Sequence, residues 1–381
     1  MATANLTKLR VLFIAPVPPP ITGQAVACEA LYIDLSGQGH EVTLINLSKQ
    51  SFRQGINSIG RLLEIAQILG KTLRHARNAD LVYLTPAESV AGNLKDMAIL
   101  LCLGSKTKRT FLHLHGGAGM RKLLSDRRPW LHRMNAWLLR RVAGVIVLGE
   151  RHVSIYSHIV PRARIHVVKN FAGDEWFIED QSLAQKWAQR NRLNVLFLSN
   201  HLPGKGYQEL IEAIQLIPSS QRAQFDFHFA GGFEDETSKS EFLGHIATLD
   251  GVTYHGTVSG EAKKRLFHAA HLFCLPTYYP YEGQPISILE AYASGCAVIT
   301  TDHSGIFDIF TPEENGWEVQ PRSAQSITNV LLRSLYEFDS VAGMGQMNAR
   351  QASTEYRRTQ HLQVLNRCLG LVRPADASPV T

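Results

Sequence analysis

A lysine and two glutamates stand next to segments that favour anion binding in the second half of the sequence. Lys205 lies in the segment Pro203-Gly204-Lys205-Gly206, between an apolar run and an amphipathic stretch. Glycines let the backbone approach a ligand closely, and the start of a helix offers unpaired N–H groups, so this turn suits a phosphate. A solvated turn lysine is the alternative interpretation.

The segment from Glu282 to Glu290 is the most informative stretch of the sequence. Pro285 suits the first position of a helix that Gly295 would end, and the first backbone N–H groups of this helix, near Ile286, would then form an anion site. We expect Glu282, in the preceding loop, and Glu290, one turn inside the helix, to accept hydrogen bonds from sugar hydroxyls. The alternative is that Glu282 caps the helix and Glu290 is exposed.

Short apolar runs that alternate with amphipathic stretches would position these residues, and this alternation is typical of parallel α/β units. Strands are expected at 11–15, 42–46, 81–84, 110–114, 145–148 and 165–168, and then at 195–199, 225–230, 252–255, 272–275 and 297–301. Ligands bind beyond the carboxyl ends of such strands. Lys205 and Glu282 each follow a predicted strand, which agrees with that rule.

The alternation pauses between residues 170 and 190, which predicts two doubly wound parallel sheets in separate domains. We expect an N-terminal domain over 1–175 and a C-terminal domain over 188–354. A helix is expected over 355–372, followed by a disordered tail over 373–381.

Glu282 and Glu290 have seven residues between them, and the segment that follows runs from Ala291 to Ile299. The surrounding motifs are Pro203-Gly204-Lys205-Gly206, Gly256-Thr257-Val258, Ser304-Gly305-Ile306-Phe307-Asp308 and Asn315-Gly316. Together they resemble the family 4 retaining glycosyltransferases of GT-B fold. The resemblance implies two Rossmann-like domains that face a cleft, with a C-terminal helix that can return to the N-terminal domain.

The resemblance also implies roles in binding a nucleotide diphosphate sugar. Lys205 would contact the diphosphate, Glu290 the ribose and Glu282 the transferred sugar. The phosphates would be bound by backbone N–H groups of the segment Gly283-Gln284-Pro285-Ile286, and Val258 would lie near the base. Asn200 stands where the family usually has an arginine that pairs with the diphosphate.

Two sites in the first half complete the predicted set. Gly23 follows Thr22, which can cap a helix, and by the resemblance Gly23 would contact the diphosphate; a purely structural turn is the alternative. His113 and His115 share one face of a predicted strand. The resemblance implies that His115 hydrogen-bonds the donor sugar, whereas a core histidine and an H-x-H zinc pair remain alternatives.

The stretch from Arg121 to Arg141 interleaves basic residues with leucines and with Trp130 and Trp137, and it resembles an interfacial amphipathic helix. Residues 1–170 hold 23 basic and 9 acidic residues, a net charge of +14, against −8 for the remainder. Peripheral contact with an anionic membrane is therefore expected. The alternatives are a packed helix, simple solvation and a basic nucleic-acid-binding protein, although we expect no nucleic-acid partner.

The remaining sequence features bound the function. The five cysteines are scattered, and neither a signal-peptide core nor a membrane-spanning stretch is evident, so a cytoplasmic location is expected. No D-x-D triplet occurs, and we expect no metal or other cofactor.

The predicted function is the retaining transfer of a hexose to a saccharide or lipid-linked acceptor in polysaccharide or glycolipid assembly. A sugar-nucleotide epimerase or hydrolase is an alternative. A dinucleotide-dependent oxidoreductase is another, but the G-x-G-x-x-G pattern after the first strand is missing.

Overall fold

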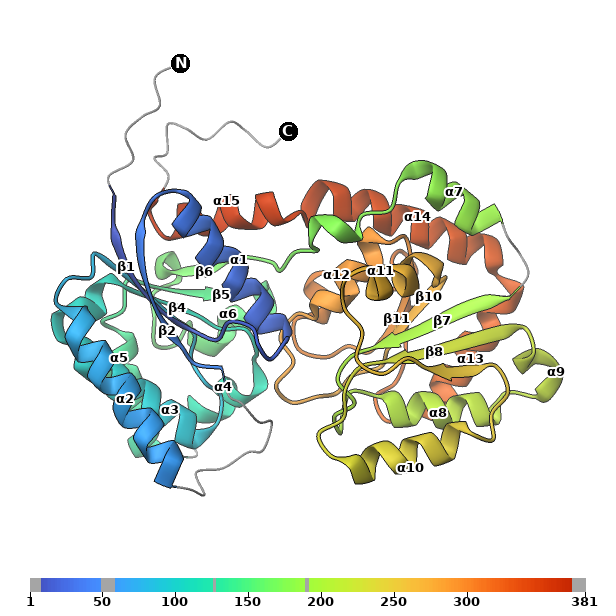
Figure 1. Ribbon diagram of the computed structural model, residues 1–381, viewed down its shortest axis with the longest axis horizontal. Coiled ribbons are helices and arrows are strands. Elements are labelled where there is room, and N and C mark those ends of the chain that lie inside the picture. Colours follow the sequence, from blue (N-terminus) through green and yellow to red (C-terminus); the bar gives the residue numbers. More distant parts are fainter. Residues whose placement is uncertain (1–7, 49–58, 126–127, 189–191, 372–381) are drawn as a thin grey trace, which may run out of the picture. The chain divides into compact units, whose positions relative to one another are not determined.

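The computed structural model describes residues 8–48, 59–125, 128–188 and 192–371. The chain forms two compact units (Figure 1). Unit 1 contains Met1–Lys169 and Thr359–Thr381, and unit 2 contains Asn170–Arg358.

Unit 1 is built on a parallel six-stranded sheet in the order β2-β1-β3-β4-β5-β6. Its strands are β1 (Arg10–Ala15), β2 (Glu41–Asn46), β3 (Leu81–Leu84), β4 (Thr110–His113), β5 (Gly144–Val147) and β6 (Ile165–Val167). Its helices are α1 (Gly23–Gly37), α2 (Ile59–Ala76), α3 (Val90–Leu103), α4 (Ala118–Leu123), α5 (Pro129–Leu139), α6 (Glu150–Tyr156) and α15 (Arg358–Cys368).

Apolar helix faces cover both sides of the unit 1 sheet, as buried parallel strands require. Helices α2, α3 and α5 pack on one side, for example through Ile68, Leu100 and Leu139. Helices α1 and α15 pack on the other side, through residues such as Leu31 and Leu365.

Unit 2 has a second parallel six-stranded sheet, in the order β12-β11-β10-β7-β8-β9. Its strands are β7 (Leu193–Leu198), β8 (Phe225–Ala230), β9 (Val252–Tyr254), β10 (Leu272–Leu275), β11 (Ala297–Thr300) and β12 (Gly316–Glu318). Its helices are α7 (Asp180–Ala188), α8 (Tyr207–Leu216), α9 (Ser219–Arg222), α10 (Glu236–Ile246), α11 (Gly260–Ala269), α12 (Ile286–Ala293), α13 (Ala324–Tyr336) and α14 (Phe338–Glu355). Because β7 neighbours both β8 and β10, the loops after these three strands meet at one edge of the sheet.

The predicted fold class is confirmed within each unit, and every predicted strand is present to within about two residues at either end. The sequence reading missed only β12 among the strands of the described residues. This strand is three residues long and reads Gly-Trp-Glu, so it has no apolar run to detect.

The unit boundaries fall at 169/170 and 358/359, where the sequence suggested 175 and 354. Ala172 bridges Arg357, and the Ala172 N–H donates to the Tyr356 carbonyl at 2.8 Å, so both segments belong to unit 2. The helix expected over 355–372 is shorter, because α14 continues to Glu355 and α15 starts at Arg358. The tail expected to be disordered, 373–381, lies outside the described residues.

The stretch from Arg121 to Arg141 is not the single helix that was expected. It contains the end of α4 and the whole of α5, which begins at Pro129, and Arg127 lies outside the described residues. Proline favours the first position of a helix, which explains why a separate helix, α5, starts at Pro129. Among the described residues, no helix is both long and apolar enough to cross a membrane.

Gly231, directly after β8, provides a test of the unit 2 framework. Its φ is +136°, and a Cβ atom there would lie 1.9 Å from the Ser199 carbonyl oxygen. We expect Gly231→Ala to lower the free energy of unfolding by about 2 kcal/mol or more, because it adds both a clash and backbone strain. Thermal unfolding of the full chain would measure this as a lower midpoint.

Gly244 is the matched control, because it lies in α10 and a Cβ atom added there would meet nothing within 4 Å. Gly244→Ala should raise stability by about 0.5 to 1 kcal/mol, since alanine favours a helix. Equal unfolding midpoints for the two variants would contradict the close approach at Gly231.

Candidate active site

The turn that carries Lys205 lies against the loop that follows β10. Gly206 has a φ of +88°, and a Cβ atom there would lie 2.5 Å from the Pro276 carbonyl oxygen. The Gly204 carbonyl accepts the N–H of Tyr278 at 2.7 Å. The glycines of this motif therefore serve the contact between the two loops, and Gly206 also precedes α8 directly.

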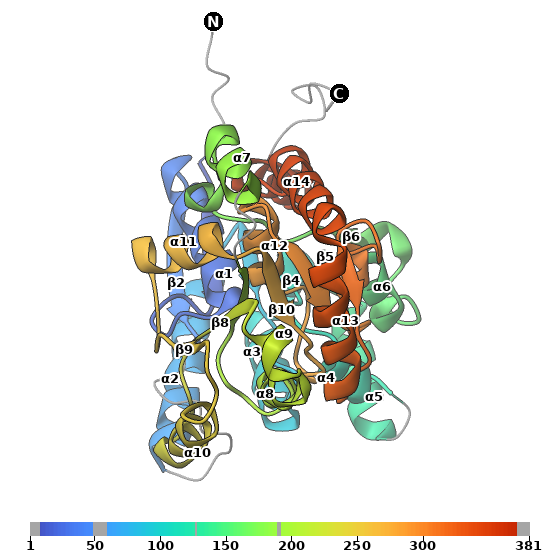
Figure 2. The same ribbon diagram turned by 90° about the vertical axis from the view of Figure 1, so that its right-hand side faces the viewer.

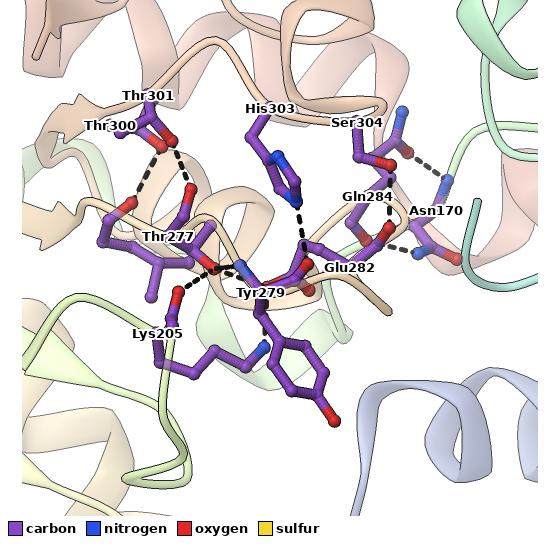
Figure 3. A network of polar contacts seen from close by, with 12 residues as sticks. Asn170, Lys205, Thr277, Tyr279, Glu282, Gln284, Thr300, Thr301, His303 and Ser304 are labelled. Atoms are coloured by element: carbon purple, nitrogen blue, oxygen red, sulfur yellow. Dashed lines mark hydrogen bonds and ion pairs between the residues drawn. The ribbon is translucent and has the colours of Figure 1, made fainter. Parts of the chain in front are cut away.

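Lys205 and Glu282 form an ion pair at the edge where β7 and β10 end (Figure 3). The Lys205 Nζ lies 2.6 Å from the Glu282 Oε2, and the side chains are only 13% and 10% exposed. The Thr277 hydroxyl lies 3.2 Å from the same carboxylate oxygen, and the Tyr279 ring lies 4.8 Å from the ammonium. An ammonium has three donors, so Lys205 retains capacity to donate to a ligand.

The loop after β11 fixes the segment that contains Glu282. The Ser304 hydroxyl donates to the Glu282 carbonyl at 2.7 Å, and the Gly305 N–H donates to the Gly283 carbonyl at 3.0 Å. His303 Nε2 lies 2.7 Å from the Tyr279 carbonyl. Ser304 has a φ of 51°, an unusual value for a residue other than glycine, which marks this loop as strained at the site.

Gln284 is buried and contacts the first residue of unit 2 (Figure 3). Its side-chain oxygen accepts the Asn170 N–H at 2.7 Å, and its carbonyl accepts the Asn170 side-chain amide at 2.7 Å. The Gln284 side chain thus holds the loop before α12 in place. Sequence reasoning did not identify Asn170, since a lone asparagine in a polar segment carries no signal of its partner.

Helix α12 begins at Ile286, one residue later than expected, and Pro285 is its N-cap. The ψ of Pro285 is 119°, which is extended backbone, and no side chain caps the helix. No side chain therefore accepts a hydrogen bond from the N–H groups of its first turn, of which the Ile288 N–H donates to the Pro285 carbonyl at 3.2 Å. Gly295 follows the helix with a φ of +70°, as expected for a helix stop.

Glu290 is buried within α12 and pairs with a lysine that sequence reasoning missed. The Lys263 Nζ, on α11, lies 2.6 Å from the Glu290 Oε1, and the side chains are 19% and 6% exposed. The Trp176 ring lies 4.5 Å from the same ammonium. The expected alternative of an exposed Glu290 is therefore wrong, and Glu282 does not cap α12.

Asn200 and His201 follow β7, where the family resemblance predicted a second cation. His201 is buried and stacks on Phe233 with ring centroids 4.3 Å apart. Burial lowers the pKa of His201 to about 4, so its ring is neutral at pH 7 and does not replace an arginine. Asn200 is partly exposed, and Val258 lies in the loop between β9 and α11.

In unit 1, His113 and His115 lie on the same side of the chain at the end of β4, with ring centroids 4.1 Å apart. The Tyr83 hydroxyl lies 2.6 Å from His113 Nδ1, and Cys28 Sγ lies 3.8 Å from His115 Nε2. Desolvation lowers the pKa of His115 to about 3, with a smaller effect from His361, so the ring acts as a neutral hydrogen-bonding group. In the described part of the chain, no three His, Cys, Asp or Glu side chains form a group suited to a metal ion.

Thr22 caps α1 as expected, because its hydroxyl accepts the Ala25 N–H at 3.1 Å. Gly23 is exposed at the first position of this helix. The donor contacts assigned to Gly23 and His115 stay predictions.

Glu88 is a further residue that the sequence analysis did not identify. It follows β3, and its carboxylate accepts the Met120 N–H at 3.0 Å and also the N–H groups of Gly117 and Gly119. A Cβ atom at Gly116 would lie 1.5 Å from its Oε1. The turn directly after His115 therefore folds around the Glu88 carboxylate.

One family model matches part of the chain. The model of the glycosyl transferases group 1 matches residues 179–346. The matched residues lie within unit 2. The resemblance to family 4 glycosyltransferases predicted from Glu282, Glu290 and the neighbouring motifs is thereby confirmed.

This chain is similar to curated glycosyltransferases. It is 27% identical over 207 residues to the amylovoran biosynthesis glycosyltransferase AmsK of Erwinia amylovora, covering 53% of this chain and 49% of the relative. It is 28% identical over 173 residues to the O-antigen chain mannosyltransferase B of Escherichia coli, covering 43% of each. The chain thus spans about half the length or less of these two relatives.

Solved structures extend the likeness of fold to nearly the whole chain. The structure of Anabaena HepE in complex with UDP-glucose is 16% identical with a TM-score of 0.70, and the match covers 96% of this chain and all of that one. WaaG, a glycosyltransferase involved in lipopolysaccharide biosynthesis, gives a TM-score of 0.67 at 16% identity, with 94% of this chain and all of WaaG covered. The predicted GT-B fold is therefore confirmed.

The pair of Lys263 and Glu290 allows a test of charge compensation in unit 2. We expect Lys263→Met to lower the free energy of unfolding by about 3 kcal/mol, because it leaves the Glu290 carboxylate buried without its ammonium. The double variant Lys263→Met with Glu290→Gln should recover part of this loss. Urea unfolding of the parent chain, the double variant and the two single variants, Lys263→Met and Glu290→Gln, would measure these effects, and additive losses would contradict the pairing.

Glu88 predicts a stability that depends on pH. Desolvation raises its pKa from an ordinary value of 4.5 to about 7. Between these pH values the folded chain binds more protons than the unfolded chain, so stability falls as the pH rises from about 5 to about 7. Glu88→Gln removes this contribution, at most about 1.4 kcal/mol per pH unit.

The measurement compares unfolding midpoints of the parent chain and the Glu88→Gln variant from pH 5 to pH 8. The difference between them should shift in favour of the variant as the pH rises. Glu64→Gln, on the exposed side of α2, is the control for loss of one carboxylate. A parent-to-variant difference that is constant with pH would show that Glu88 does not titrate in this window.

Proposed function

We propose that this chain is a glycosyltransferase that moves a hexose from a nucleotide diphosphate sugar to an acceptor hydroxyl. The proposal depends on one observation: a weakly exposed lysine and carboxylate, 2.6 Å apart, lie beside the uncapped start of α12. A diphosphate requires positive charge and N–H donors, and a sugar requires carboxylate acceptors, so this edge of unit 2 has the chemistry for both.

In the proposed donor complex, Lys205 and the N–H groups at the start of α12 bind the diphosphate. Glu282 accepts hydrogen bonds from hydroxyl groups of the transferred sugar, and Glu290 accepts hydrogen bonds from the ribose hydroxyls. The complexes of HepE with UDP and with UDP-glucose support a nucleotide-sugar donor. Because His201 is neutral, Lys205 is the positively charged side chain in the loops after β7 and β10, both of which the structure describes.

The chemical step breaks the bond between the anomeric carbon and the diphosphate oxygen and forms a bond to the acceptor oxygen. We propose retention of the anomeric configuration, with the leaving diphosphate oxygen taking the acceptor proton. Lys205 and the α12 N–H groups stabilise the negative charge that develops on the leaving group, as fixed donors do in other transition states. This assignment needs no divalent metal or other cofactor.

We propose a saccharide or lipid-linked acceptor in polysaccharide or glycolipid assembly. The names of AmsK and of the O-antigen mannosyltransferase support this class of product. The five cysteines are free thiols, and three of them are buried, which supports a reducing, cytoplasmic compartment. A lipid-linked acceptor would be met at the inner face of the cytoplasmic membrane.

Substitution of the ion pair tests the proposed mechanism. We expect Lys205→Ala and Glu282→Ala each to lower the transfer rate by at least about 10² to 10³, the cost of losing one preorganised donor or acceptor. The matched control is the exposed pair of Lys239 and Glu236, 2.8 Å apart on α10. Alanine at either control position should leave transfer unchanged.

The assay is mass spectrometry of the products from uridine and guanosine diphosphate sugars, with saccharide acceptors. Unfolding midpoints of each variant would separate loss of chemistry from loss of folding. Full transfer activity in either Lys205→Ala or Glu282→Ala would remove that residue from the mechanism. Donor consumption that needs no acceptor would favour the epimerase or hydrolase instead.

A further inference from the structure

Helices α2, α3 and α5 form one layer of unit 1, and α3 contacts both of its neighbours. The same three helices lie side by side in both views of the ribbon (Figures 1 and 2). Their inner sides pack on the sheet through residues such as Ile68, Leu100 and Leu138. A surface helix normally has polar residues on its outer side.

The outer sides of these helices also carry large exposed apolar side chains, which on α2 lie among exposed polar residues such as Gln67 and Lys71. On α2, Leu62 and Leu73 are 60% and 55% exposed, and eleven residues bring them to the same side of the helix. On α3, Leu94 and Leu101 are exposed and seven residues apart, which again gives one side. Each of these two helices therefore has a second apolar stripe that faces away from the sheet.

Helix α5 continues the pattern with larger side chains. Trp130, Met134 and Trp137 are exposed and follow the spacing i, i+4, i+7 of one helix side. The guanidinium of Arg141 lies 3.7 Å from the centre of the Trp137 ring. An indole at the surface with a cation beside it is typical of side chains at a membrane–water interface.

The exposed apolar side chains of unit 2 give a contrast. They are Leu216, Leu243, Tyr281, Tyr336 and Met347, and they lie on α8, α10, a loop, α13 and α14 respectively. Single exposed apolar residues of this kind are normal on soluble proteins. Three adjacent helices with parallel apolar stripes are not, and they mark an interaction surface.

The charged residues of α2 and α5 indicate what kind of partner this surface would bind. Helix α5 contains no carboxylate and carries Arg133, with Arg140 directly after it. Helix α2 has one carboxylate, Glu64, against Arg61, Lys71 and Arg74. Two copies of this surface would bring like charges together, whereas an anionic lipid surface offers both the opposite charge and an apolar interior.

We infer that the outer face of α2, α3 and α5 is a docking surface for an anionic lipid bilayer. The leucines and tryptophans enter the interfacial region, and the arginines and lysines contact lipid phosphates. The inference is independent of the transfer reaction, because binding to lipid needs neither donor nor acceptor.

Vesicle flotation tests this surface with the full chain and no substrate. We expect the parent chain to float with phosphatidylcholine vesicles that contain phosphatidylglycerol, and not with phosphatidylcholine alone. High salt should reduce the bound fraction, because it screens the charges. Replacing Arg133 and Arg140 together by glutamine should lower the partition coefficient about 25-fold, or about fivefold for each charge.

The control removes the same charge from unit 2, where Arg265 and Arg350 are exposed on α11 and α14. Glutamine at both positions should leave vesicle binding within about twofold of the parent chain, since those charges lie outside the docking surface. An equal loss of binding in the two double variants would show that only net charge matters, and would overturn the assignment of the face.

Tryptophan fluorescence reports on the apolar contact. Trp130 and Trp137 are 54% and 49% exposed, whereas Trp176, Trp187 and Trp317 are 7%, 6% and 1% exposed. Anionic vesicles should therefore shift the emission of the parent chain to shorter wavelength. The variant with Trp130→Phe and Trp137→Phe should lose this shift but still float.

Two results would overturn the inference. One is a parent chain that stays unbound with anionic vesicles or floats equally well with neutral ones. The other is a blue shift without vesicles that grows with protein concentration and disappears in the phenylalanine variant, which would assign the surface to self-association. Unfolding midpoints of all variants would establish that each one is folded.

Discussion

The contact between the Lys205 turn and the loop after β10 is the interaction on which the candidate site depends. Strands β7 and β10 are neighbours, so their following loops start side by side. Gly206 then allows the turn to approach the Pro276 carbonyl closely enough for Lys205 to reach Glu282. A larger residue at that position would separate a buried ammonium from its carboxylate, and both desolvation and the lost pair would destabilise unit 2.

The two lysine–glutamate pairs of unit 2 share a physical logic. Each places a weakly exposed carboxylate next to an ammonium, Glu282 with Lys205 and Glu290 with Lys263. Each carboxylate thus stays compensated without a ligand, yet has a second oxygen that can accept further hydrogen bonds. In the proposed reaction, an arriving diphosphate would share the Lys205 ammonium with Glu282. Donor binding would therefore use a cation that is already in place.

The sequence predicted most of the fold because its signals are local. Apolar runs such as 195–199 and 272–275 mark buried parallel strands, and the short β12 was missed because it has no such run. Lys205 and Glu282 were identified because each follows a strand. Lys263 was not, since its role depends on α11 and α12 lying together, a tertiary contact that no spacing along the chain encodes. The same reason hid Glu88, whose partners are backbone groups about 30 residues away along the sequence.

Helix α15 has a consequence for the order in which the chain is completed. Leu365, Leu369 and Leu371 belong to the same apolar cluster as Val11 and Phe13, although the whole of unit 2 lies between them in the sequence. During synthesis, unit 1 therefore lacks one wall of its core until the ribosome has passed residue 371. A fragment that stops at residue 169 would keep α1 on this side of the sheet but would lack Leu365, Leu369 and Leu371, so part of the cluster would be open to water. The two units are separate in structure, yet unit 1 is completed only after unit 2 has been synthesised.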